Sequence, residues 1–208
     1  ETAENLADAQ LVIVSSAITE NNPEFAEAKS RGIPIAARAV ALAWLMSEST
    51  SVAVAGTHGK TTTTAMLTVS LQSAGLDPSF AIGGTINTAG INAHSGSGSI
   101  FVAEADESDG SFLAYKPTGA VITNVELDHV DHFADEEAVY AVFEDFISSI
   151  KVDGFLVACG DDQGVKTLLS RIKRNDLKIY LYGKGSNNDF RIDQINLAPN
   201  SSRAIISI

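Results

Sequence analysis

The stretch SVAVAGTHGKTTTT, residues 51–64, decides the fold of this chain. It opens with a short apolar run that contains valines, which is typical of a buried strand. A helix is predicted from about Thr61 to Ala74, where Gly75 ends it. The glycine-containing segment between them completes a unit of strand, phosphate-binding loop and helix.

The loop from Gly56 to Thr61 has the chemistry that a nucleotide phosphate requires. Glycines let the backbone N–H groups turn toward phosphate oxygens, and the helix N-terminus adds a favourable dipole. We expect Lys60 to neutralise the β- and γ-phosphates and Thr61 to offer its hydroxyl to Mg²⁺. A glycine-rich turn with a solvated lysine is the plain alternative, but the apolar strand and the run of threonines favour nucleotide binding. The residues predicted to bind the nucleotide are Gly56, Thr57, His58, Gly59, Lys60, Thr61 and Thr62.

Other apolar runs alternate with helical patterns on both sides of this unit. Strands are predicted at 11–14, 33–36, 100–104, 120–123, 155–159 and 179–182, and helices near 23–32, 39–48, 135–149 and 161–173. The alternation predicts an α/β fold, a mostly parallel sheet with helices on both faces. The runs at 190–197 and 204–208 have no helix between them, so we expect an antiparallel hairpin at the sheet edge.

The polar stretch near residues 47–51 is the expected domain boundary. Residues 1–49 are interpreted as the C-terminal part of a Rossmann-like substrate-binding domain, and residues 50–208 as a nucleotide-binding domain. The first strand lacks a preceding βα unit and the chain stops inside a strand-like run. We therefore expect a piece of a longer chain.

Composition narrows the range of partners. The 208 residues are 45% apolar and 19% charged, without the run of about 20 apolar residues that a membrane helix needs, so we expect no membrane partner. The net charge of −12 argues against nucleic acid, because that polymer is bound by Lys and Arg. A single cysteine, Cys159, excludes an internal disulfide and favours a cytoplasmic location. The oligomeric state is not predicted.

A second group of polar residues follows the predicted strand at 100–104. Glu104 ends that strand, and ligands of open α/β sheets bind beyond the carboxyl ends of strands. Glu104 is therefore a candidate metal ligand near the phosphate loop. For Glu107 and Asp109, a solvated face and a functional role remain equally open.

The segment NVELDHVDH, residues 124–132, follows another strand end. Imidazole and carboxylate groups suit divalent cations, although oxygen-rich sites favour Mg²⁺ and histidine alone suggests a transition metal. By itself the pattern fits a zinc site, a phosphohydrolase or a solvated loop.

The phosphate loop also departs from the general pattern, because Val54 stands where a glycine is usual, six residues before the lysine. With GTHGKTTT at 56–63, EADESD at 104–109 and the residues from Asn124 to His129, this shorter loop resembles the Mur ligases, ATP-dependent amide-forming enzymes of cell-wall synthesis. The resemblance also includes VSSAI at 14–18 and covers nearly the whole chain, with high specificity from 52 to 132.

Within the family, His58 is typical of the alanine-adding branch, and Ser108 favours that branch over murein peptide recycling, where tyrosine is usual. The resemblance implies that UDP-N-acetylmuramate and L-alanine are joined through an acyl phosphate. Lys60, Glu104 and His129 are then the catalytic residues, and Thr61, Glu104 and His129 hold magnesium.

Two further sets of residues enter through the resemblance. Ser15, Ser16, Thr85 and Asn124 are implied substrate-binding residues, with Thr85 in a glycine-rich segment, 83–90, interpreted as a loop beside the sugar. Several relatives carry a carbamylated lysine on the helix after the histidine motif, but residues 135–149 contain no lysine, so this role is not carried over. How the second metal site is completed stays open.

Three alternatives stay beside this interpretation. One is the recycling ligase of the same family, and another is a P-loop phosphotransferase or NTPase without ligase activity. The third is a nucleotide-binding fragment without turnover.

Overall fold

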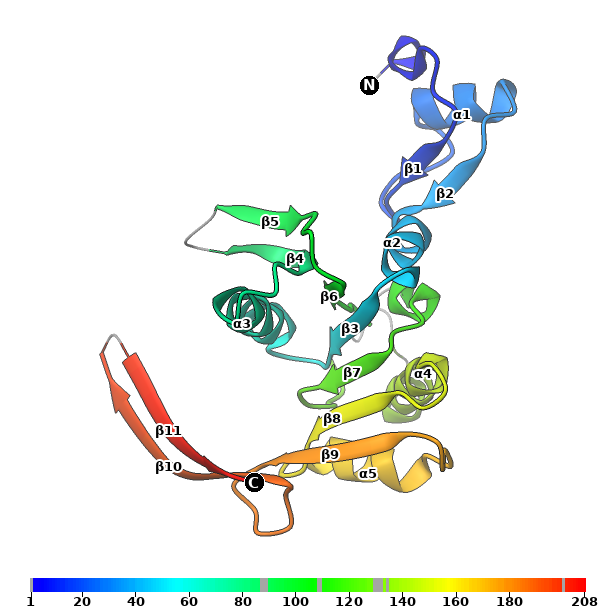
Figure 1. Ribbon diagram of the computed structural model, residues 1–208. Coiled ribbons are helices and arrows are strands. Elements are labelled where there is room, and N and C mark those ends of the chain that lie inside the picture. The colour runs from blue at the N-terminus through cyan, green and yellow to red at the C-terminus, as the bar shows by residue number, and fades with distance from the viewer. Residues whose placement is uncertain (1, 87–89, 108–109, 129–132, 134, 200) are drawn as a thin grey trace.

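We describe a computed structural model of the chain, which covers residues 2–86, 90–107, 110–128, 133, 135–199 and 201–208 (Figure 1). The helices are η1 (Ala3–Leu6), α1 (Pro23–Ser30), α2 (Arg38–Ser47), α3 (Lys60–Ser73), η2 (Ser111–Ala114), α4 (Glu136–Ser149) and α5 (Gln163–Arg171). The strands are β1 (Val12–Val14), β2 (Ile35–Ala37), β3 (Thr50–Ala55), β4 (Ser79–Ile86), β5 (Ile91–His94), β6 (Ile100–Glu104), β7 (Gly119–Ile122), β8 (Phe155–Cys159), β9 (Lys178–Gly183), β10 (Phe190–Ala198) and β11 (Ser201–Ser207). None of the described helices is long and apolar enough to cross a membrane.

The described strands form two sheets. β1 and β2 pair in parallel as a small sheet beside α1 and η1, and α2 leads from this N-terminal unit to β3 (Figure 1). The large sheet has nine strands in the order β11-β10-β9-β8-β7-β3-β6-β4-β5. β3 lies between β6 and β7 and is parallel to both, so the phosphate loop leaves the middle of the sheet.

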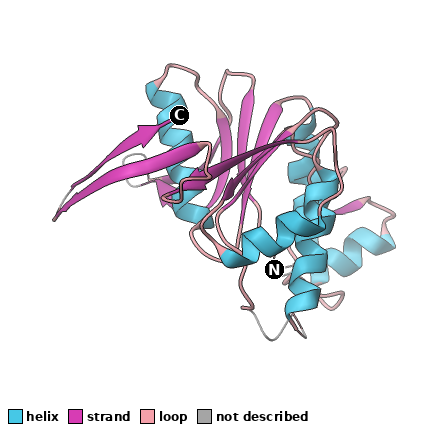
Figure 2. Ribbon diagram, turned by 90° about the horizontal axis from the view of Figure 1, so that it is seen from below, coloured by secondary structure: helices cyan, strands magenta, loops and turns pink. Residues whose placement is uncertain are grey.

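Helices cover both faces of the large sheet, as the sequence predicts (Figure 2). On one face, α3 packs on Phe80, Ile82 and Val102. On the other face, side chains of α2, α4 and α5 belong to the larger core. Because neighbouring strand residues point to opposite faces, Phe101 and Val102 of β6 belong to different cores.

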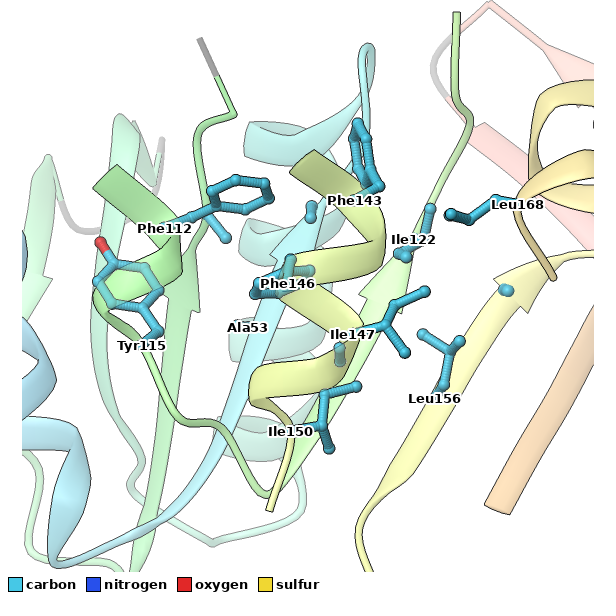
Figure 3. Close-up of a cluster of buried hydrophobic side chains, with 14 of the residues drawn as sticks. Ala53, Phe112, Tyr115, Ile122, Phe143, Phe146, Ile147, Ile150, Leu156 and Leu168 are labelled. Carbon is cyan, nitrogen blue, oxygen red and sulfur yellow. The ribbon is translucent and has the colours of Figure 1, made fainter. Parts of the chain in front are cut away.

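The larger core is centred on aromatic residues from η2 and α4 (Figure 3). Phe112 stacks on Phe146 with ring centroids 4.6 Å apart and meets Phe143 edge-on at 5.9 Å. All three rings are fully buried. Ile122 of β7 and Leu156 of β8 belong to the same cluster, so η2 packs on the core between the sheet and α4.

Helix starts follow the sequence closely. Asn22 accepts hydrogen bonds from the N–H groups of Glu24 and Phe25, and Pro23 occupies the first turn. Asp135 and Asp162 cap α4 and α5 in the same way. These short-range side-chain contacts explain why the predicted helix starts lie within about two residues of the observed ones.

The sheet edges give one confirmed prediction and one correction. β10 and β11 pair antiparallel and extend beyond the other strands as a ribbon, as expected (Figure 1). The interpretation of residues 83–90 as a loop is wrong for residues 83–86, because they belong to β4, which pairs with β6 and with the unpredicted strand β5. Residues 87–89 lie outside the described part of the chain.

Candidate functional site

The phosphate loop begins where β3 ends and finishes at the first turn of α3. Gly56 has φ +132° and Gly59, the N-cap of α3, has φ +80°. L side chains rarely adopt either conformation, so both positions favour glycine. The backbone of this segment therefore forms the turn that a phosphate loop needs, with the N-terminus of a 14-residue helix behind it.

The end of β7 supports the loop from one side. The Thr57 N–H donates to the Asn124 carbonyl (3.1 Å), and the His58 N–H donates to Asn124 Oδ1 (2.8 Å). In return, Asn124 Nδ2 and Thr123 Oγ1 donate to the His58 carbonyl at 3.1 and 2.6 Å. Asn124, predicted to bind substrate, thus has its side chain engaged with the loop backbone.

Lys60 points back into the loop. Its Nζ donates to the carbonyl oxygens of Gly56 (2.9 Å) and Thr57 (3.2 Å), and it lies 3.0 and 2.9 Å from the two carboxylate oxygens of Glu107. Only 11% of the Lys60 side chain and 2% of the Glu107 side chain are exposed. The ammonium group therefore lies in a largely desolvated site with one carboxylate as its counter-charge.

Glu107 is the functional candidate that the sequence left undecided. It is not a solvated residue, because it is buried beneath the loop and paired with Lys60. Burial raises the pKa of this carboxyl group, and the hydrogen bond from Lys60 opposes the rise only in part. Its position three residues after a strand-end carboxylate was the available signal, but that spacing did not distinguish it from a surface residue.

Thr61 and Glu104 meet at the mouth of the loop, as predicted. The Thr61 hydroxyl donates to Glu104 Oε1 at 2.7 Å, and the Gly83 N–H donates to Glu104 Oε2 at 2.6 Å. A Cβ atom at Gly83 would lie 3.0 Å from Glu104 Oε2, and one at Gly84 would lie 2.8 Å from the Thr61 methyl group. The glycines that suggested a loop instead let β4 approach these two side chains.

The donor types at this point fit Mg²⁺, which prefers hydroxyl and carboxylate oxygens. Within the described residues, no three His, Cys, Asp or Glu side chains are grouped as a metal site. His129, predicted as a further ligand, lies outside the described residues, as do Ser108 and Asp109. Three of the predicted site residues are described, and the fold brings them to the carboxyl ends of the central strands: Lys60, Thr61 and Glu104.

A cavity of about 400 Å³ opens beside Glu104, between the N-terminal unit and the large sheet. This volume is within the usual range for small-molecule sites. Polar and charged side chains from both units face it, including Arg38 of α2 and Asn92 of β5. The lining residues are Ile13, Arg38, Ala41, Leu42, Leu45, Ala81, Ile82, Gly83, Asn92, Ala93, Glu104, Asp106 and Tyr115.

The predicted substrate-binding residues do not line this cavity. Ser15 and Ser16 directly follow β1, one and two positions beyond the strand end, although Ile13 of the same strand lines the cavity. Thr85 is an exposed residue near the end of β4. The sequence missed Arg38 and Asn92, because only the tertiary arrangement brings α2 and β5 near Glu104.

A phosphate loop at the central strand of a mostly parallel sheet covered by helices defines an α/β nucleotide-binding protein. Residues 54–208 match the family described as Mur ligase middle domain, and residues 1–50 match the one described as Mur ligase family, catalytic domain. The chain belongs to the Mur ligase family. This family consists of ATP-dependent amide-forming ligases.

Curated relatives agree with this assignment. The UDP-N-acetylmuramate--L-alanine ligase of Renibacterium salmoninarum is 53% identical over 184 residues, which are 88% of this chain and 40% of the relative. The enzyme of the same name from Saccharopolyspora erythraea is 46% identical over 210 residues, 99% of this chain and 43% of the relative. The chain thus spans about two fifths of the length of these relatives.

Solved structures share the fold over nearly the whole chain. The UDP-N-acetylmuramate:L-alanyl-gamma-D-glutamyl-meso-diaminopimelate ligase from Neisseria meningitides superposes with a TM-score of 0.82 and 27% identity, covering 99% of this chain and 68% of that one. The UDP-N-acetylmuramate-alanine ligase from Thermotoga maritima gives a TM-score of 0.80 and 25% identity, covering 99% and 45%.

Proposed function

We propose that this chain is the nucleotide-binding part of a ligase that joins L-alanine to the lactoyl carboxylate of UDP-N-acetylmuramate, using ATP. The observation that carries the proposal is a pair of contacts at the phosphate loop, Thr61 with Glu104 and Lys60 with Glu107, beside a cavity. The names of relatives about 50% identical to this chain support the choice of substrates. We also propose a cytoplasmic location, which a reaction between a UDP-sugar, ATP and an amino acid supports.

The chain's own residues contribute mainly position and charge to the reaction. The loop N–H groups and Lys60 would hold the triphosphate, and Thr61, Glu104 and His129 would hold Mg²⁺. The metal would supply neutralisation of the phosphate oxygens, which lets an anionic carboxylate approach. One carboxylate oxygen forms a bond to the γ-phosphorus while the bond from that phosphorus to ADP breaks. Lys60 would offset the charge that develops on the transferring phosphoryl group.

The second step leaves the phosphate as inorganic phosphate. The amine nitrogen of L-alanine attacks the acyl carbon, the carbon–oxygen bond to the phosphate breaks, and the nitrogen loses a proton. Holding the acyl phosphate away from water is then as important as forming it, because water would release the acid unchanged.

The cavity is the proposed site of the acid substrate. It lies beside Glu104 and receives Arg38 from the N-terminal unit, so a sugar acid bound there would reach the metal with its carboxylate. We also propose that the change of domain falls near residues 47–51, where α2 leaves the small sheet and β3 begins the large one. Substrate would then bind between the two units.

Lys60→Ala in the full-length enzyme tests the proposal directly. Because Lys60 is the cation that the loop itself supplies, we expect the variant to lose turnover, at least about a thousandfold. The measurement is phosphate release that depends on both UDP-N-acetylmuramate and L-alanine. Lys178→Ala, at the start of β9 and so at the amino end of the sheet, is the matched control.

Two results would contradict parts of the proposal. Near-normal turnover in Lys60→Ala would exclude this mechanism. Release of phosphate from ATP by the wild type without UDP-N-acetylmuramate and L-alanine would indicate an NTPase. The similarity to the Neisseria structure favours a second test, in which a preformed tripeptide replaces L-alanine. Ligation of the tripeptide in preference to L-alanine would assign the recycling reaction.

A further inference from the structure

Glu107 has no role in the mechanism above, yet it is one of the most buried side chains of the molecule and the only carboxylate among the described residues that contacts the phosphate-loop lysine. It sits in the loop between β6 and η2, three residues after Glu104. The two carboxylates have separate partners, since Glu104 binds Thr61 and Glu107 binds Lys60. Glu104 therefore lies with the proposed metal ligand Thr61, and Glu107 lies with the lysine.

The three protons of the Lys60 ammonium are all engaged within the protein. Their acceptors are the Gly56 carbonyl, the Thr57 carbonyl and the Glu107 carboxylate. To donate to a β- or γ-phosphate, Lys60 must give up at least one of these contacts. Which contact it gives up determines what Glu107 does.

The carbonyl contacts are the easier ones to lose. Breaking the contact with Glu107 would separate two opposite charges in a largely desolvated site, which is costly in a protein interior. Releasing Gly56 or Thr57 leaves only a neutral carbonyl group with one fewer donor. Lys60 can thus turn toward a phosphate while keeping Glu107 as its anchor.

We propose that Glu107 is the positioning residue of Lys60, and that it stays bound to the ammonium group when ATP occupies the loop. The inference deepens the proposed function, on which it rests, by naming the side chain that directs the lysine at the transferring phosphoryl group. Glu107 fixes the direction of the ammonium group, and the two carbonyl groups release that group when nucleotide arrives.

The test uses the full-length enzyme and the isosteric variant Glu107→Gln. Without the Glu107 carboxylate, the Lys60 ammonium group is no longer held in the correct direction. We therefore expect kcat to fall about tenfold to a hundredfold. Affinity for MgATP, measured by titration without the other substrates, should not increase. Glu107→Asp keeps the charge and should retain more of kcat. The control is Glu48→Gln, which changes an exposed carboxylate just before the amino end of β3.

A double variant separates positioning from a merely structural role. If Glu107 acts through Lys60, adding Glu107→Gln to Lys60→Ala should lower kcat no further. An equal loss in both backgrounds, or wild-type kcat in Glu107→Gln, would overturn the inference. MgATP binding at least about tenfold tighter in Glu107→Gln would also overturn it, because it would mean that Lys60 leaves Glu107 when nucleotide binds.

The outcomes also distinguish this inference from the proposed function. The MgATP titration needs no acceptor, so it tests the fate of the Lys60–Glu107 contact whatever acid is ligated. Failure of the wild type to ligate L-alanine would contradict the proposed function and leave the titration interpretable.

Discussion

The backbone of the phosphate loop follows from individual glycines. Gly56 and Gly59 both have positive φ, but their surroundings differ. A Cβ atom at Gly56 would lie 2.1 Å from Thr123 Oγ1 and 3.0 Å from the Thr123 nitrogen, whereas one at Gly59 would meet no atom within 4 Å. The same substitution therefore tests conformational strain alone at one position and strain plus overlap at the other.

We expect Gly59→Ala to destabilise the protein by about 1 kcal/mol, the lower end of the cost of a left-handed residue with a side chain. Gly56→Ala should cost about 3 kcal/mol or more, because overlap with Thr123, the residue after β7, adds to the strain. Urea denaturation of the two variants measures the difference. Equal losses would mean that the contact between this loop and the end of β7 is not held as tightly as described.

The loop residues could be predicted from sequence because each one acts through its own chemistry. Glycines permit the turn, Lys60 supplies charge and Thr61 supplies a hydroxyl, and all of them lie within a few positions. The role of Glu107 could not be predicted, since it depends on burial and on a partner 47 positions away. Sequence patterns report local conformation, whereas a buried ion pair is a property of packing.

At the scale of elements, Glu104 ends β6 and Glu107 lies between β6 and η2. β6 is paired on both sides, with β3 and β4, up to or just before Glu104. η2 packs Phe112 against the rings of Phe143 and Phe146 of α4. Strand pairing therefore holds Glu104 near the loop, and Glu107 is held there by its burial and its contact with Lys60.

Phe112→Ala should destabilise the protein by about 3–5 kcal/mol, because it removes a fully buried ring and leaves a cavity. Leu113→Ala is the control in the same short helix, where 36% of the leucine is exposed, and it should cost less than about 1 kcal/mol. Thermal unfolding with circular dichroism compares them. Similar losses for both variants would show that η2 is not anchored through Phe112.

Sequence periodicity predicts the strands and helices whose identity is decided locally, and it fails where tertiary contacts decide. Gly83 and Gly84 have low strand propensity, yet β4 pairs with β5 on both sides of them, and Gly83 contacts Glu104, so they lie in a strand. β5 was missed because it has only 4 residues and all of them are exposed. Both strands lie at the edge of the sheet that faces the cavity.

At the scale of the whole molecule, charge must be concentrated where anions bind. The chain carries a net charge of −12, so its overall electrostatic field does not attract an anionic nucleotide or sugar acid. Lys60 supplies positive charge within the loop, and Arg38 brings it to the cavity from the other unit. The sequence predicted the first of these and not the second, because folding brings α2, β4 and β5 around one cavity from distant parts of the chain.

Arg38→Ala tests whether the cavity between the two units binds the acid substrate. An arginine that pairs with an anionic group contributes about 1.5–3 kcal/mol, so KM for UDP-N-acetylmuramate should rise roughly tenfold to a hundredfold. Affinity for MgATP should be unchanged, because Arg38 does not contact the phosphate loop among the described contacts. Arg31→Ala is the matched control, since Arg31 donates to the Ala7 carbonyl within the N-terminal unit and does not line the cavity. If Arg38→Ala left KM for the sugar nucleotide unchanged while Lys60→Ala still abolished turnover, the nucleotide site would stand and the substrate would have to bind elsewhere.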